Sequence, residues 1–325
     1  MMLPIRSSPA HTSQPAVAKA RRRPIGVRIT ILLVIIGLLT TTSVSAQQSA
    51  LEPAFSDEII DTFGYPEIDI EVGPDGVTAP DSLTAGHYLV TLSAPEPWVA
   101  YVNFMQPPAG LGDEEATELA LAAASADLAQ PGWVYAGGNN TFELGVPVKF
   151  IVQLNPGDYK IAASYYQLEG DQEEVMELLP LTVTESATPV PANGPDATAT
   201  LDMTDGLEYI VSPDAVPAGP QVWEITNSGE HHAHHAVFFR IPDGVTEDDI
   251  VTDFISLMSG TPPAGPPLIS QFTHVGYAAL QSGGQTTWVE LDFDPGTYAV
   301  ICFIIDPGTG QPHVMNGMAT TFTVQ

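Results

Sequence analysis

The stretch Tyr298-Ala-Val-Ile-Cys302-Phe-Ile-Ile-Asp-Pro-Gly-Thr-Gly-Gln-Pro312-His313-Val-Met315-Asn-Gly317-Met318 decides how the rest of the sequence is interpreted. It contains the only cysteine of the chain, at the end of an apolar run typical of a buried strand. A turn-rich segment, a histidine and a methionine follow, and the run from Thr320 to Val324 is typical of another strand. A thiolate, an imidazole and a thioether at one strand-loop-strand corner form a ligand set for a soft metal ion.

A histidine cluster upstream offers the further imidazole that such a site requires. Two imidazoles, a thiolate and a weak axial thioether bind copper. Cys302, the element Pro312-His313-x-x-x-Gly317-Met318 and the closing strand resemble the copper-binding loop of the plastocyanin/azurin cupredoxins. Asn227-Ser-Gly229, leading to the run 235–239, resembles the strand that carries their first histidine. The resemblance is strongest over residues 201–325, and it implies one copper ion held by His235, Cys302, His313 and, axially, Met318.

Side-chain alternation favours His235 within the cluster. Alternate residues of a strand share a face, so His235 would lie with Val237 and Phe239, which we expect to point into the core. His234 would then face the other way. A secondary metal role stays open for His231, His232, His234 and Met315.

Two hypotheses account for Cys302. An exported chain with one cysteine forms no internal disulfide, so metal coordination or deep burial must protect the thiol from oxidation. Ten residues separate Cys302 from His313, which leaves room for thiol and imidazole to lie apart. The alternative to a copper protein is therefore a metal-free cupredoxin-like interaction or structural module at the cell surface.

The N-terminus is typical of an export signal. Basic residues precede the apolar run Ile29 to Leu39, and Val44-Ser-Ala46 offers small residues for cleavage, which predicts a signal peptide over residues 1–46 and an extracytoplasmic protein. An uncleaved signal anchor is the alternative. Beyond residue 46 the chain keeps three basic residues against 39 acidic ones, a formal charge of −36. Such a surface disfavours nucleic acid and anionic membranes as partners.

Residues 67–325 contain the same sequence of features twice. Residues 67–185 and 201–325 each show alternating strands, a Pro and a Gly before an acidic helix (Asp113 to about Leu128, and Glu247 to about Met258) and a Pro-Gly turn before an apolar strand. A leader (47–66) precedes them, and a Pro/Ala-rich linker (186–200) separates them. We expect an all-β fold of two tandem cupredoxin-like Greek-key β-sandwich domains, each with a short inserted helix and its own core. Aligning the copies places Cys302 opposite Ala163 and His235 opposite Ala100, so the N-terminal copy lacks the ligands.

No catalytic motif accompanies these features. His232-Ala-His234 is the only His-x-His pair, and no nucleophile or phosphate-binding motif occurs, so we expect no enzyme. The sequence predicts an exported copper-binding protein for electron transfer or copper handling. Its partner would be a redox protein or a copper donor or acceptor.

Overall fold

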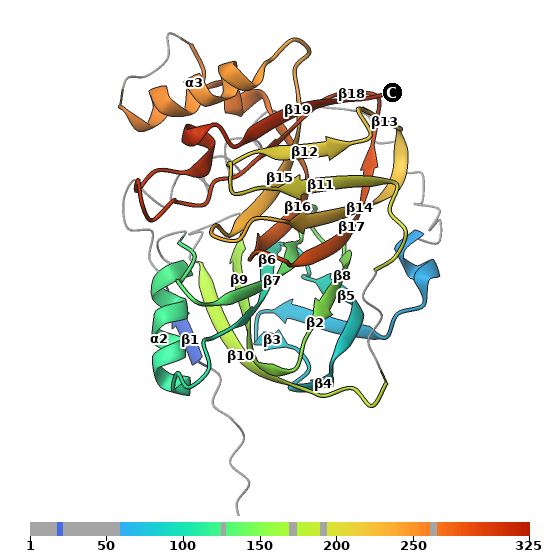
Figure 1. Cartoon of the computed structure of the whole chain (residues 1–325), viewed down its shortest axis with the longest axis vertical. Coiled ribbons are helices and arrows are strands. Elements are labelled where there is room, and N and C mark those ends of the chain that lie inside the picture. The colour runs from blue at the N-terminus through green and yellow to red at the C-terminus, as the bar shows by residue number, and fades with distance from the viewer. Residues whose placement is uncertain (1–17, 22–58, 125–127, 169–173, 189–193, 261–264) are drawn as a thin grey trace, which may run out of the picture.

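The computed structural model describes residues 18–21, 59–124, 128–168, 174–188, 194–260 and 265–325. They form two large β-sheets, with the N-terminal half of the chain below the C-terminal half in Figure 1. The strands of the N-terminal half are β2 (Glu67–Gly73), β3 (Gly76–Thr78), β4 (Ser82–Thr84), β5 (Gly86–Ser93), β6 (Trp98–Gln106), β7 (Val134–Asn140), β8 (Val148–Leu154), β9 (Gly157–Gln167) and β10 (Val175–Thr184). Those of the C-terminal half are β11 (Ala199–Met203), β12 (Tyr209–Ser212), β13 (Ala215–Val216), β14 (Gly219–Asn227), β15 (His234–Ile241), β16 (Thr273–Gln281), β17 (Thr286–Phe293), β18 (Gly296–Ile301) and β19 (Ala319–Val324).

Each half pairs its strands in the same way. In the N-terminal half β2 pairs with β3 and β5, β5 with β8, β6 with β7 and β9, and β10 with β9 and β4. The corresponding strands of the C-terminal half, β11 to β19, repeat these pairings with the same parallel or antiparallel sense. The all-β sandwich expected from the sequence is confirmed, and the repeated order agrees with the internal repeat.

The two halves share both sheets. Strand β7 pairs antiparallel with its counterpart β16, and β8 with its counterpart β17, which joins four-stranded units into an 8-stranded sheet and merges the other strands into an 11-stranded sheet. One buried apolar cluster runs between the sheets through both halves. This differs from the expectation of two separate cores. Edge strands present unpaired N–H and C=O groups, and pairing counterpart edges satisfies them.

The helices follow their sequence signals. Helix α3 (Glu247–Met258) starts at a capping box, in which Thr246 Oγ1 accepts from the Asp249 N–H and Asp249 accepts from the Thr246 N–H. Helix α2 (Asp113–Ala124) has three acidic residues in its first turn. Figure 1 shows both helices on the same side of the molecule. There α3 buries Ile250 and Phe254 in a second apolar cluster that covers the outer face of β15 and β18.

The part of the predicted leader that the structure describes packs across the junction between the halves. The short 3₁₀ helix η1 (Ile59–Phe63) buries Ile60 against Trp288 and Ile151, and the Ile60 N–H donates to Glu290 of the C-terminal half. Lys149 pairs with Asp61 of this helix at 2.7 Å.

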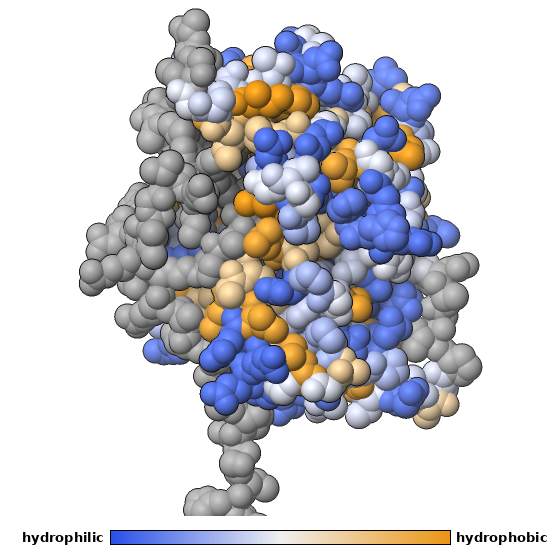
Figure 2. Space-filling model, turned by 60° about the vertical axis from the view of Figure 1, so that its left-hand side comes forward, coloured by the Kyte–Doolittle hydropathy of each residue, from blue (hydrophilic) through white to orange (hydrophobic). Residues whose placement is uncertain are grey.

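Hydrophilic residues cover much of the described surface in the view of Figure 2.

Most of the predicted signal peptide, including the apolar run, lies outside the described residues. Ala18–Arg21 form strand β1, which pairs antiparallel with β10. Within the described ranges, no helix is both long and apolar enough to cross a membrane.

Candidate metal centre

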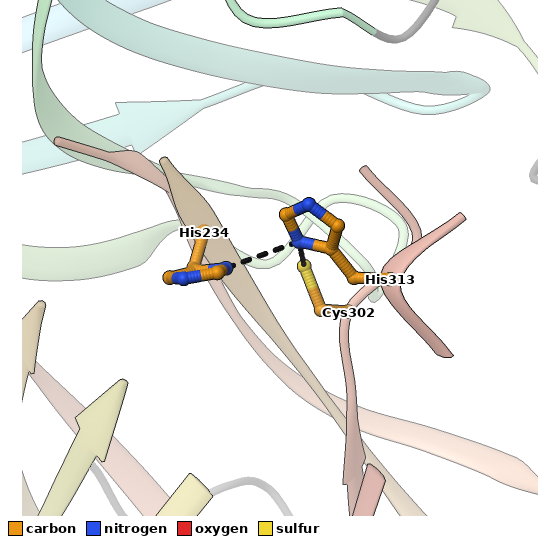
Figure 3. A group of neighbouring side chains, drawn as sticks. All are labelled: His234, Cys302 and His313. Carbon is orange, nitrogen blue, oxygen red and sulfur yellow. Dashed lines mark hydrogen bonds between the residues drawn. The ribbon is translucent and has the colours of Figure 1, made fainter. Parts of the chain in front are cut away.

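Three buried side chains from separate segments converge at one end of the C-terminal half, as Figure 3 shows. His313 Nδ1 lies 3.1 Å from His234 Nδ1 and 3.5 Å from Cys302 Sγ. His234 and Cys302 are 0% exposed and His313 is 1% exposed. One donor atom from each residue lies within 4.8 Å of the other two. Among the described residues this is the one group of His, Cys, Asp and Glu donors that converges so closely.

Neighbouring strands fix two of these side chains. Strand β15 begins with His234, and β18 ends at Ile301, directly before Cys302. The two strands pair antiparallel from Val237 opposite Ile301 onward, so their ends hold imidazole and thiol side by side. Most residues of both strands are buried, on both faces of the sheet.

The long segment between Cys302 and His313 folds back on itself. Ile305 and Pro312 form an antiparallel bridge, and the Asp306 N–H donates to the Gln311 carbonyl at 2.9 Å. The turn between them is held by the Asp306 carboxylate, which accepts from the Gly308 N–H at 2.6 Å. The ten-residue segment is thus a closed hairpin, and it returns the chain to Cys302.

Backbone hydrogen bonds then tie His313 to the cysteine. The His313 N–H donates to the Ile304 carbonyl at 2.8 Å, and the Val314 N–H donates to the Cys302 carbonyl at 2.9 Å. His313 opens the 3₁₀ helix η3 (His313–Asn316), which ends at Gly317 with φ 102°, a conformation that favours glycine. Thiol and imidazole therefore stay together despite the long loop.

The structure brings His234, and not His235, to this cluster. The expectation rested on one face of β15 being buried, but both faces are: His234, Ala236 and Phe238 face the core between the sheets, whereas Val237 and Phe239 face the cluster under α3. A shift of one residue along a strand moves a side chain to the opposite face. Periodicity alone therefore could not choose between the two histidines.

The sheet ladders show the same shift by one residue. Phe104 pairs with Ile161, two residues after Tyr159, and Phe238 pairs with Val300, two residues after Tyr298. Four positions before these phenylalanines stand Ala100 and His234, so His234 is the counterpart of Ala100. The repeat in the sequence predicts His235 at this position, one residue further along the strand. Ala100 and Ala163, the counterparts of His234 and Cys302, are buried, and the described part of the N-terminal half has no donor at either position.

His235 instead supports the cysteine. Its Nε2 accepts from the backbone N–H of Phe303 at 2.8 Å, and its carbonyl accepts from the Tyr209 hydroxyl. The backbone N–H groups of His235 and Ile304 donate to the Cys302 sulfur, and Tyr209 hydrogen-bonds to it as well. The sequence does not identify Tyr209 as a site residue, because Tyr209 belongs to β12 and no spacing pattern links it to Cys302.

The other candidate residues differ in their positions. Met318 is fully buried in the core cluster that contains Cys302, its N–H donates to the His313 carbonyl at 3.1 Å and its carbonyl accepts from the Cys302 N–H at 3.2 Å. Met315 packs against the apolar cluster under α3. His231 is exposed. The His232 ring lies beside the His313 ring, with centroids 5.8 Å apart.

Burial keeps the donors uncharged in the absence of a cation. It lowers the pKa of His234 to about 3, aided by the neighbouring His313 and His232 rings, and that of His313 to about 4. Burial also raises the pKa of the Cys302 thiol to about 11, although the backbone N–H groups of His235 and Ile304 favour the thiolate. A bound cation would supply the charge that makes the thiolate stable here.

The donor geometry fits a small transition-metal ion. Bonds of about 2.0–2.3 Å to nitrogen and sulfur place the donors of a three- or four-coordinate ion roughly 3.3–3.8 Å apart. The two separations from His313 Nδ1, 3.1 and 3.5 Å, agree with this range within a few tenths of an ångström, and the third pair of donors lies within 4.8 Å. His313 Nδ1 faces two other donor atoms at once and carries one proton or one lone pair, so it serves only one of them, whereas a shared cation would satisfy all three.

Comparisons with solved structures find cupredoxins. The chain is similar to an auracyanin from the photosynthetic bacterium Roseiflexus castenholzii (18% identity over 39% of this chain and 94% of that chain, TM-score 0.26). It is also similar to auracyanin A, a "blue" copper protein of Chloroflexus aurantiacus (17% identity over 39% of this chain and 96% of that chain, TM-score 0.25). A further match is an azurin of Methylomonas sp. strain J (14% identity over 39% of this chain and 95% of that chain, TM-score 0.24). No protein-family model matches the chain, and a search of the curated proteins finds no significant relative. These matches agree with the cupredoxin resemblance predicted from the sequence, and scores this low carry no conclusion about the family, activity or partners of this chain.

Proposed function

We propose that this chain is an exported copper protein that transfers electrons or handles copper through one ion in its C-terminal half. The ligands would be His234, Cys302 and His313, with Met318 as the weak axial ligand. The observation that carries the proposal is the convergence of two imidazole nitrogens and the thiol sulfur in a site at most 1% exposed. Imidazole suits copper in either oxidation state, and thiolate and thioether favour Cu(I).

The chain's own residues would keep such a site rigid. The ladder between β15 and β18 fixes His234 and Cys302, and the closed hairpin with its backbone hydrogen bonds fixes His313. A bound copper ion would supply the one-electron couple. A ligand frame that moves little when the charge changes lowers the reorganisation needed for electron transfer, and the N–H groups that donate to the Cys302 sulfur would tune the potential.

Electron transfer or copper handling, without enzymatic turnover, is the role that we assign to this site. The four ligands that we propose would fill the coordination positions of the ion and leave none open for a substrate molecule. The high negative charge of residues 47–325 favours a partner with a basic surface, either a redox protein or a copper donor or acceptor, and disfavours nucleic acid and anionic membranes. Export by the N-terminal segment belongs to the proposal, and the size of the secreted or membrane-bound chain would test it.

A Cu(II) titration of the full-length protein tests the site. Visible absorption should show an intense thiolate-to-copper band that saturates at one ion per chain, and electron paramagnetic resonance should show narrow copper hyperfine splitting. The control is Cys302→Ser, which keeps the volume but removes the thiolate. The visible band also distinguishes copper from zinc, because zinc bound at the same residues would leave the solution colourless.

A weak, histidine-type copper signal in the electron paramagnetic resonance spectrum that survives Cys302→Ser would contradict the proposal. The metal-free alternative would then hold, with Cys302 and His313 as core residues of an interaction or structural module.

A further inference from the structure

A metal ion must reach donors that are sealed from solvent. Cys302 and His234 are 0% exposed and His313 is 1% exposed, and the β15–β18 ladder and the closed hairpin hold all three in place. An aquated ion exchanges its water molecules for protein ligands one at a time, so a group that binds it at the surface and touches the buried donors would lower the barrier to uptake.

His232 has the required position. Its ring centroid lies 5.8 Å from that of His313 and 6.1 Å from that of His234, and those two rings are themselves 4.9 Å apart. The side chain of His232 is 31% exposed, so one imidazole reaches both solvent and the two buried rings. Its Nδ1 is buried and has no hydrogen-bond partner among the residues that the structure describes.

The surrounding loop holds His232 in that position. The Asp205 carboxylate accepts from the backbone N–H groups of Glu230, His231 and His232 at 2.8, 2.9 and 3.2 Å. The His232 carbonyl accepts from the Asn227 side chain at 2.8 Å. The same carboxylate lies 3.7 Å from His232 Nδ1 and is 33% exposed, which places a negative charge beside the imidazole at the surface.

We propose that His232, with the Asp205 carboxylate beside it, is the loading site through which a copper ion passes from solvent to His234, Cys302 and His313. This inference rests on the proposed function and adds the route by which the ion arrives. His232 would bind Cu(II) transiently, and the ion would then pass to the two rings that His232 adjoins. Cys302 loses its thiol proton to solvent as the sulfur–copper bond forms, and copper keeps its oxidation state in this step.

A transient ligand changes rates and leaves the equilibrium unchanged. Removing it raises the same barrier from both sides, so uptake and release should slow by the same factor. A permanent ligand would instead change the affinity and the spectrum. This distinction makes the inference testable independently of the site itself.

The experiment is stopped-flow mixing of the full-length metal-free protein with aqueous Cu(II), followed at the thiolate-to-copper band. The reverse reaction is release to an excess of chelator. His232→Ala should slow both by about tenfold, with the final absorbance and the dissociation constant unchanged. The matched control is His231→Ala, which removes an exposed imidazole from the same loop and should leave both rates unchanged.

Three results would overturn the loading site. Rates equal to wild type in His232→Ala would show that the ion enters elsewhere. Equal slowing in His231→Ala and His232→Ala would mean that the histidine cluster as a whole attracts the copper ion, and that the position of His232 has no special role. A changed spectrum or affinity in His232→Ala would make His232 a permanent ligand. The equilibrium absorbance of the wild type is measured before the rates. If the wild type forms no thiolate-to-copper band at equilibrium, the proposed function itself fails.

Discussion

The Nε2 atom of His235 accepts a hydrogen bond from the backbone N–H of Phe303, the residue that follows Cys302, at 2.8 Å. This bond ties the first turn of the ligand loop to β15. Because Nε2 accepts, the proton of the neutral ring is on Nδ1, which faces the Tyr277 hydroxyl at 3.5 Å. The neighbouring residue His234 faces the opposite side of the strand and meets His313. Two adjacent histidines thus have different tasks.

Substitution of these two histidines should separate the tasks. His234→Ala removes a nitrogen donor, so we expect the thiolate-to-copper band to be lost. His235→Leu should keep the band but leave the buried Phe303 N–H without an acceptor, at a cost of about 1–3 kcal/mol in the free energy of unfolding. Copper titration and urea denaturation measure the two effects. His235→Gln, which keeps an acceptor, is the matched control, and loss of the band in His235→Leu with retention in His234→Ala would reverse the assignment.

Copper affinity should rise with pH by one proton equivalent. The pKa of the Cys302 thiol is raised to about 11 by burial, so the thiol is protonated in the metal-free protein at neutral pH and must release its proton on binding. The pKa values of His234 and His313, lowered by burial to about 3 and 4, leave both rings neutral above pH 5. Between pH 5 and 9 the dissociation constant should therefore fall about tenfold per pH unit. Competition titrations with a chelator of known affinity measure this slope, and a slope of two near pH 5 would mean that a ligand histidine is charged.

Met318→Leu should test the axial ligand without disturbing the core. Leucine fills a similar volume, so the stability should change by less than about 1.5 kcal/mol. Replacing the weak thioether donor by a hydrocarbon side chain makes the surroundings of the ion more apolar, which disfavours the more highly charged Cu(II) and should raise the reduction potential, with the visible band retained. Voltammetry of the copper-loaded variant provides the measurement. Met315→Leu is the control, because Met315 packs under α3, and an unchanged potential in Met318→Leu would show that Met318 only fills the core.

His274 should make the fold sensitive to acid independently of the metal. Its ring contacts Phe142 and Phe239 and is half-buried, and this partial burial lowers its pKa to about 4. An unfolded histidine binds a proton below about pH 6.5, so its neutral burial costs stability as the pH falls from 6.5 to 4. Wild type should lose about 2 kcal/mol between pH 7 and 5 relative to His274→Leu. Urea denaturation of both proteins at each pH measures the difference, and parallel pH profiles would contradict a buried neutral ring.

The C-terminal half should not be stable without its partner half. A chain of residues 194–325 would expose the edges of β16 and β17, which pair with β7 and β8 in the full chain, and would lose the contact of Trp288 with Ile60. Open edges of this kind promote association of chains. We expect the fragment to form more oligomers or aggregates in size-exclusion chromatography than the full chain does at the same concentration. A folded monomeric fragment that binds copper would show that the shared sheets are dispensable for the site.

Several features followed from the sequence because local chemistry determines them. The capping box at Thr246 predicted helix α3 with the bounds that the structure has. The apolar runs after the Pro-Gly turns predicted β9 and β18, and the lone cysteine with His313 marked the end of the C-terminal half where the cluster lies. Each of these signals acts within a few residues, and tertiary packing reinforced it.

Only the tertiary structure decided which histidine joins Cys302. Alternation along β15 separates His234 from His235 but does not say which face meets the thiol, because α3 buries the outer face as fully as the second sheet buries the inner one. The same holds for Tyr209, Asp205 and the pairing of β7 with β16, which join residues far apart in the chain. Local sequence specified the donors and their strands, whereas the packing of both faces of one sheet determined which donors meet.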